Sequence, residues 1–108
     1  MVTRLKHLGV VSESLTGTAG TISVGRCREV EVQVILDGNA SHEIAVRPTK
    51  SASGTVSKDS AAAVLADMGA VNFKIGNNDW YVAYKVYSGA SVATGTSASD
   101  KILVTKLG

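Results

Sequence analysis

The stretch REVEVQVIL, residues 28–36, decides the fold class of this chain. Apolar residues occupy every second position of it, namely Val30, Val32, Val34 and Leu36. The positions between them are polar, namely Glu29, Glu31 and Gln33. A side-chain period of two is the signature of a β-strand with one buried face. We therefore predict a strand here and a β fold around it.

Turn residues and a second alternating stretch follow this strand. Asp37-Gly38-Asn39 favours a turn, because Gly and Asn tolerate a positive φ. The next segment, SHEIAVRP (41–48), again alternates, and its Pro48 has no amide hydrogen with which to continue a strand ladder. We predict that residues 28–36 and 41–48 form a β-hairpin.

The spacing of apolar residues is no longer two in KDSAAAVLADMGAV, residues 58–71. Four of its apolar residues follow the i, i+3, i+4, i+7 spacing of one helix face, namely Ala61, Val64, Leu65 and Met68. Ser57 or Asp59 can cap the start, and Gly69 stands where a left-handed C-terminal residue belongs. We predict one short α-helix at about residues 58–68.

The rest of the chain supplies further strands. AVNFKI (70–75) and WYVAYKVY (80–87) flank a turn and predict a second hairpin, and KILVTKL (101–107) predicts a closing strand. The first 25 residues hold weaker strand candidates. The sum is a mainly β fold: a small antiparallel β-sandwich or barrel of about six strands with one short helix. We expect a single domain over residues 1–108, with residues 1–20 as a candidate extended N-terminal arm.

Composition narrows the class of protein. The 108 residues carry a net charge of only +2, which gives no signal for binding a polyanion. A single cysteine, Cys27, excludes an internal disulfide framework and suits a reducing compartment. No apolar run has the length of a signal peptide core or of a membrane helix, so we expect no membrane contact. Ala, Gly, Ser and Thr fill 45 positions, which suits turns and close chain contacts more than a catalytic pocket.

No motif for catalysis, cofactor binding or metal binding stands out. His7 and His42 are the only histidines, and neither has a neighbour at metal-ligand spacing. Cys27 lies between Arg26 and Arg28, whose positive charge would lower a thiol pKa, but no base is placed to activate it. We expect no catalytic residues, no cofactor and no metal, and hence no enzyme.

The segment 80–87 holds the most informative side chains. On a strand, Trp80, Val82, Tyr84 and Val86 share one face, which we expect to pack in the core. The other face carries Tyr81, Lys85 and Tyr87, our first candidate interface. Three roles remain open for it: packing within the chain, contact with another protein, and stacking against single-stranded nucleic acid or a sugar.

Basic residues also gather near both ends of the chain. Arg4 and Lys6 stand at the N-terminus, and Lys101 and Lys106 stand near the C-terminus. If the terminal strands pair, these residues form one mildly basic edge, so Arg4 and Lys6 join the candidate interface. The alternative is a solvated edge whose charge discourages aggregation.

In composition and loop pattern, the whole chain resembles the small virion proteins of tailed bacteriophages, such as capsid decoration (cement) proteins and small tail proteins. The likeness lies in one short β domain with Ala/Gly/Ser/Thr-rich loops such as SGASVATGTSASD (88–100) and TKSASGTVS (49–57). It implies a non-enzymatic structural protein that forms homo-oligomers and contacts virion shell or tail proteins, with its N-terminal arm and loops at the contacts. It also implies a location in the virion after assembly in the host cytoplasm. The alternative is a small β module that binds single-stranded nucleic acid.

Overall fold

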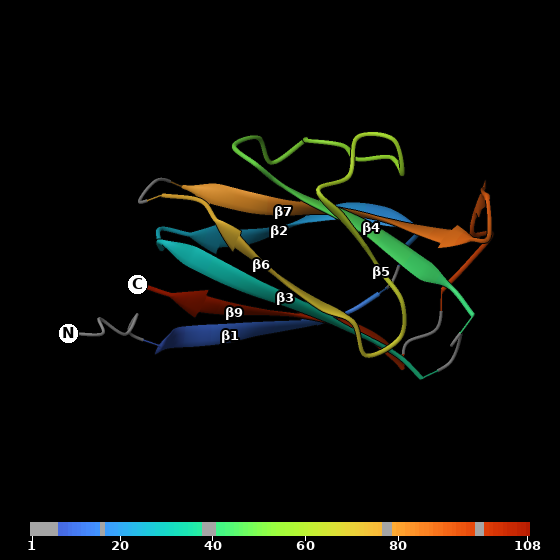
Figure 1. The fold of residues 1–108 in the computed structure, drawn as a ribbon, viewed down its shortest axis with the longest axis horizontal. Coiled ribbons are helices and arrows are strands. Elements are labelled where there is room, and N and C mark those ends of the chain that lie inside the picture. Colours follow the sequence, from blue (N-terminus) through green and yellow to red (C-terminus); the bar gives the residue numbers. More distant parts are fainter. Residues whose placement is uncertain (1–6, 16, 38–40, 77–78, 97–98) are drawn as a thin grey trace.

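The computed structural model describes residues 7–15, 17–37, 41–76, 79–96 and 99–108, and this part of the chain forms nine β-strands and no helix. The strands build two antiparallel sheets that pack face to face (Figure 1). The predicted mainly β antiparallel sandwich is therefore confirmed. The alternative of a closed barrel is excluded for the described strands, because each sheet has two free edges.

Each sheet has strands from distant parts of the chain. Sheet A has four strands, in the order β1 (His7–Ser14), β9 (Asp100–Leu107), β3 (Glu29–Leu36) and β6 (Ala70–Lys74). Sheet B has the order β2 (Ala19–Gly25), β7 (Trp80–Ser88), β4 (Glu43–Thr49) and β5 (Ala63–Leu65), and the short β8 (Ser91–Val92) also pairs with β7.

The core lies between the two sheets. Strand β3 packs its apolar face against this core, as its alternating sequence predicts. The four apolar side chains of β3 are fully buried, while the polar residues between them are half-buried on the outer face. Facing them from sheet B are Ile44 and Val46 of β4 and Val82 and Val86 of β7, all buried. Burial of these β-branched side chains is the main stabilising contribution.

Both predicted hairpins are wrong. β3 belongs to sheet A and β4 to sheet B, and β6 and β7 are divided between the sheets in the same way. β3 pairs instead with β9 along its whole length, from Glu29 opposite Leu107 to Leu36 opposite Asp100. Alternation identifies the buried face of a strand but not its partner. In a sandwich, two successive strands can bury that face against each other rather than lie side by side.

The predicted helix at residues 58–68 is also wrong. Residues 63–65 form β5, where Leu65 is buried while Val64 is 40% exposed, as a period of two requires. Met68, which the helix would bury, is 59% exposed. The turn that contains Met68 is bonded to β3: the Leu36 amide donates to Asp67 Oδ1 at 2.8 Å, and the Met68 amide donates to the Val34 carbonyl at 3.0 Å. These sheet contacts outweigh the weak helix propensity of an eleven-residue segment.

Within the proposed arm of residues 1–20, residues 7–14 form β1 and residues 19–20 begin β2. β1 pairs with β9 over residues 7–14, so the terminal strands do lie side by side. Residues 1–6 of the proposed arm, with Arg4 and Lys6, lie outside the described residues.

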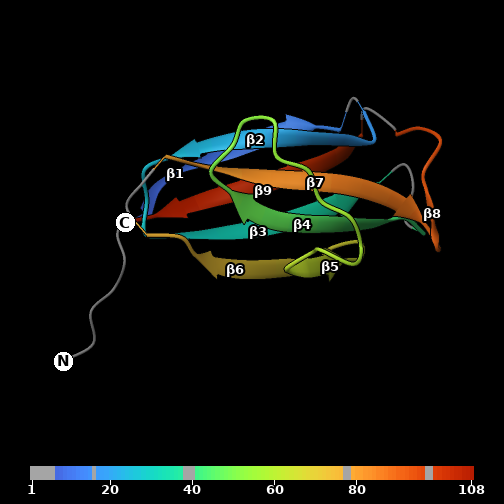
Figure 2. The same ribbon diagram turned by 90° about the horizontal axis from the view of Figure 1, so that it is seen from above.

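The two outer faces of the sandwich differ. Residues 50–62, which connect β4 to β5, pass over the outer face of sheet B and cross β7 and β4 (Figure 2). No described segment covers the outer face of sheet A (Figure 1).

Candidate interaction surfaces

The aromatic strand β7 has the two faces that its sequence predicts. Val82 and Val86 are buried in the main core, and Trp80 and Tyr84 pack partly buried against it. The opposite face points away from the core and toward the connection over sheet B.

Tyr87 is covered by that connection. It is only 7% exposed and belongs to a second apolar cluster with Ala45, Ala83 and Val56. Tyr87 therefore packs within the chain, which is one of the three roles left open for the candidate interface.

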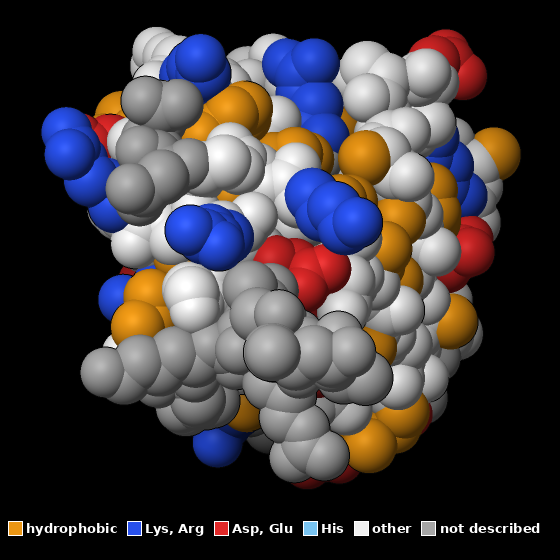
Figure 3. Space-filling view, turned by 60° about the vertical axis from the view of Figure 1, so that its left-hand side comes forward, with side chains coloured by type: hydrophobic (Ala, Val, Ile, Leu, Met, Phe, Trp, Pro, Cys, Tyr) orange, Lys and Arg blue, Asp and Glu red, His pale blue; other side chains and the backbone are white. Residues whose placement is uncertain are grey.

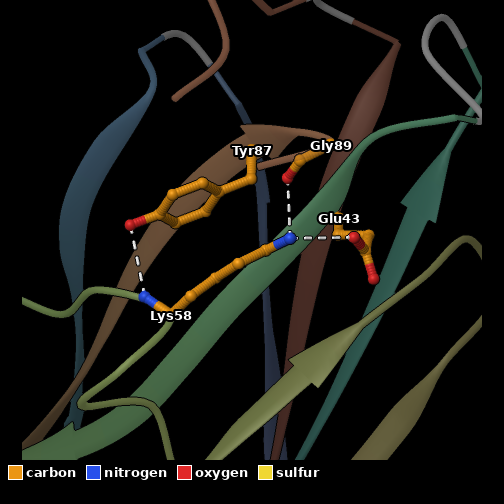
Figure 4. A network of polar contacts seen from close by, with 4 residues as sticks. All are labelled: Glu43, Lys58, Tyr87 and Gly89. Atoms are coloured by element: carbon orange, nitrogen blue, oxygen red, sulfur yellow. Dashed lines mark hydrogen bonds and ion pairs between the residues drawn. The ribbon is translucent and has the colours of Figure 1, made fainter. Parts of the chain in front are cut away.

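Lys58 fastens the connection over Tyr87 (Figure 4). Its ammonium Nζ lies 3.0 Å from Glu43 Oε1 and donates to the Gly89 carbonyl at 2.7 Å. The same ammonium lies 5.3 Å from the centroid of the Tyr87 ring, and the Lys58 amide donates to the Tyr87 hydroxyl at 3.2 Å. We call Lys58, Glu43, Tyr87 and Gly89 the Lys58 clasp. Each contact is worth about 1 kcal/mol or less where partly exposed, but all four act on one segment.

The other two residues of that candidate interface are half-buried. Tyr81 lies opposite Ser23 of β2 and Thr49 of β4. Lys85 lies at the wall of a cavity of about 310 Å³ between β2, β7 and residues 52–56. Thr21 on this wall donates its hydroxyl to the Ala52 carbonyl at 2.7 Å, which ties the start of the connection to β2. Lys85 and Tyr87 both lie near Val56 of the connection, Lys85 at the cavity wall and Tyr87 in the second apolar cluster.

Cys27 is buried, and its surroundings differ from the sequence expectation. Burial raises the pKa of its thiol. The charge of Lys106 and a backbone hydrogen bond from Leu107 lower this pKa, but by less than burial raises it. The flanking arginines do not make it a reactive thiolate. Among the described residues, no three His, Cys, Asp or Glu side chains gather where they could hold a metal ion. No helix in the described part of the chain has the length and apolar character needed to cross a membrane.

Strand β1 presents a surface that the sequence analysis missed. It is the edge strand of sheet A, and no described strand pairs with its outer edge. Leu8 and Val10 are 45% and 50% exposed on it. The HLGVVSES stretch reads as a weak strand in the sequence, and only the topology shows that it ends a sheet.

The comparisons with known proteins concern the fold alone. No protein-family model matches the chain, and no curated protein sequence matches it. Among solved structures, it is similar to PliG from Aeromonas hydrophila, a periplasmic inhibitor of g-type lysozyme. That structure is 14% identical, with a TM-score of 0.52 over 94% of this chain and 87% of that one. A pre-peptidase C-terminal domain of Bacillus anthracis collagenase is 13% identical, with a TM-score of 0.41 over 93% of this chain and 88% of that one. At these identities, only the first likeness bears on this chain, and it supports the two-sheet fold.

Proposed function

We propose that this chain is a non-enzymatic structural protein that assembles with copies of itself, as a component of a bacteriophage virion such as a capsid decoration or tail protein. The observation that carries the assembly part is the free edge of β1. The virion part rests on the composition of the whole chain. Mass spectrometry of particles purified from a lysate that contains the protein tests the virion part, which predicts that the protein is found in these particles.

The β1 edge has only part of the protection usual on an edge strand, namely an irregularity at its start, between His7 and Gly9, and one carboxylate, Glu13. It is eight residues long, contains no lysine and no proline, and exposes Leu8 and Val10. The other edges differ: β5 has three residues, β6 has five and ends at Lys74, and β2 has seven but exposes no large apolar side chain. A long edge with exposed apolar side chains offers unpaired backbone groups to another strand, so pairing with a second copy satisfies them.

The alternative function, binding of single-stranded nucleic acid, has less support at the aromatic strand. A stacking platform needs exposed aromatic rings beside cations. Tyr87 is covered by residues of the connection, and its nearest cation, Lys58, is engaged with Glu43 and Gly89. The Tyr87 part of this face is therefore closed by the chain itself, whereas Tyr81 and Lys85 are half-buried.

A lysine pair on β1 tests the assembly contact. We expect Val10→Lys with Ser12→Lys to lower the molar mass measured by light scattering during size exclusion, because like charges would meet across two paired β1 strands. Val64→Lys is the matched control, since Val64 is also exposed but lies on the three-residue β5. Unchanged mass in the β1 variant, with its circular dichroism intact, would count against β1 as the contact.

A further inference from the structure

One end of the sandwich carries mostly cations. Arg28 joins three strands there, since its amide donates to the Leu107 carbonyl at 2.9 Å and its carbonyl accepts from the Ile75 amide at 2.9 Å. Lys74 stands opposite Glu29 on the neighbouring strand. We define the basic end by five described cations and two carboxylates, Arg26, Arg28, Lys50, Lys74 and Lys106 with Glu29 and Asp79. Figure 3 brings this end forward and shows several Lys and Arg side chains across it.

The opposite end carries mostly carboxylates. Asp37 follows the last residue of β3, Asp67 accepts the Leu36 amide at 2.8 Å, and Glu43 begins β4. Asp59 follows Lys58 in the clasp segment. We define the acidic end by four carboxylates and two lysines, Asp37, Glu43, Asp59 and Asp67 with Lys58 and Lys101. Neither end is visible in the sequence, because the residues of each come from several separated turns.

The two ends are far enough apart to act independently. Strand β3 runs from Glu29 at the basic end to Leu36 at the acidic end, and the molecule is 45 Å long against 25 and 21 Å in the other directions. The Debye length at physiological ionic strength is only about 8 Å. The near-neutral net charge of +2 therefore hides a polarity along the long axis.

We propose that copies of this chain stack head to tail, with the acidic end of one molecule docked on the basic end of the next. This inference rests on the proposed self-assembly and adds the contact that runs along the long axis. Such a contact is heterologous, so it generates rings or open filaments, whereas pairing between two β1 edges is isologous and closes after two copies. A second copy fits the basic end better than nucleic acid does, because Glu29 and Asp79 oppose phosphate and the complementary surface is on the same molecule.

Met68 gives the acidic end an apolar centre. It is 59% exposed beside Asp67, and its φ of 64° is a left-handed conformation that side-chain-bearing residues rarely adopt. Hydrogen bonds from the Met68 amide to the Val34 carbonyl and from the Gly69 amide to the Ala66 carbonyl hold it there. An exposed methionine beside charged residues favours a contact, because methionine is enriched at protein–protein interfaces.

Two charge-reversed variants test the stacking. In the basic-end variant, Arg28→Glu and Lys50→Glu make both ends acidic. In the acidic-end variant, Asp37→Lys and Asp59→Lys make both ends basic. All four side chains are exposed, and none forms a hydrogen bond with another of the described residues. Lys85→Glu is the control, because it lowers the net charge at a residue that belongs to neither end.

The measurement is molar mass by light scattering, with emission of Trp80 as the second readout. Trp80 is the only tryptophan of the chain, and the Lys50 ammonium lies 5.3 Å from its ring centroid, so it reports on the basic end. We expect each end variant alone to have a Kd for stacking roughly tenfold or more above that of the parent protein, and an equimolar mixture of the two to restore assembly. We expect the control to stack as the parent does, and NaCl raised from about 50 to about 500 mM to weaken the parent's assembly.

Three results would overturn the stacking. Folded end variants that assemble as the parent does would reject it and leave the β1 contact and the proposed function standing. Folded end variants that do not assemble when mixed would also reject it. A parent protein that is monomeric at low salt would reject both the stacking and self-assembly. If that monomer binds a single-stranded oligonucleotide and loses the binding with Arg28→Glu and Lys50→Glu, the basic end serves nucleic acid instead.

Discussion

The ring of Tyr84 lies so close to its strand partner Gly20 that a Cβ on Gly20 would meet the Tyr84 hydroxyl oxygen at 2.9 Å. Two carbons of the same ring would lie at 3.1 and 3.2 Å. Burial, together with the charge of Glu13, raises the pKa of this tyrosine, so its hydroxyl stays neutral at physiological pH. The pairing of β2 with β7 therefore depends on glycine at position 20.

Gly20→Ala should lower the free energy of unfolding by about 1–3 kcal/mol, because the added methyl must displace a partly buried ring. Urea unfolding measures the change. Gly95→Ala is the control, since a Cβ at Gly95 would meet no atom within 4 Å, and it should leave stability nearly unchanged. Equal stability of the two variants would show that Tyr84 moves aside freely.

Lys58→Met should open the connection over sheet B. It removes the ion pair with Glu43, the hydrogen bond to the Gly89 carbonyl and the ring contact with Tyr87. We expect a loss of about 1–2 kcal/mol in unfolding free energy and faster amide exchange in residues 56–60. Lys50→Met is the control, because its ammonium also lies 5.3 Å from an aromatic ring but makes no ion pair with a described residue. Unaltered exchange in the Lys58 variant would mean that Val56 alone holds the segment.

Met68→Gly should stabilise the fold and weaken assembly. Glycine adopts a positive φ without strain, so we expect a gain of about 1 kcal/mol in unfolding free energy. The loss of the side chain removes the apolar centre of the acidic end. Met68→Ala separates the two effects, because it keeps the strain and also loses that centre. Stronger assembly in either variant would contradict a role for Met68 in the contact.

We predict that the protein loses stability at alkaline pH because the Cys27 thiol is buried. Its pKa is raised in the folded state, so the folded chain holds the thiol proton more tightly than the unfolded chain does. The resulting stabilisation is complete below the ordinary thiol pKa of about 8.5 and is lost as the pH rises through the folded value. Urea unfolding at pH 7.5 and 9.5 should show a smaller decline in Cys27→Ala than in the parent. The same decline in both proteins would assign it to other groups, such as Tyr84.

The sequence predicts the local structure of this protein better than it predicts which strands pair in the sheets. Alternation in REVEVQVIL and WYVAYKVY identifies two strands and their buried faces correctly, because the period of two is a local property. It does not reveal that β3 pairs with β9, about 70 residues later in the chain, and not with β4. The false helix at residues 58–68 has a similar origin. Its apolar spacing fits a helix, but the bonds from Leu36 and Val34 that fix the turn come from another part of the chain.

The interaction surfaces were predictable only in part. Tyr81, Lys85 and Tyr87 do share the outer face of sheet B, yet the cover over Tyr87 depends on Lys58, which lies 29 residues before it. The free edge of β1 and the two charged ends exist only once the strand order is known. Arg4 and Lys6 stay predictions, since they lie outside the described residues.

Self-assembly is tested most directly by the molar mass of the unmodified protein, measured by light scattering during size exclusion over a range of concentrations, with the 260/280 nm absorbance ratio read on the same peak. We predict oligomers or larger assemblies that are free of nucleic acid and whose mass falls as salt is raised. A monomer at every concentration and salt level, or a monomer that carries nucleic acid and releases it at high salt, would contradict this account.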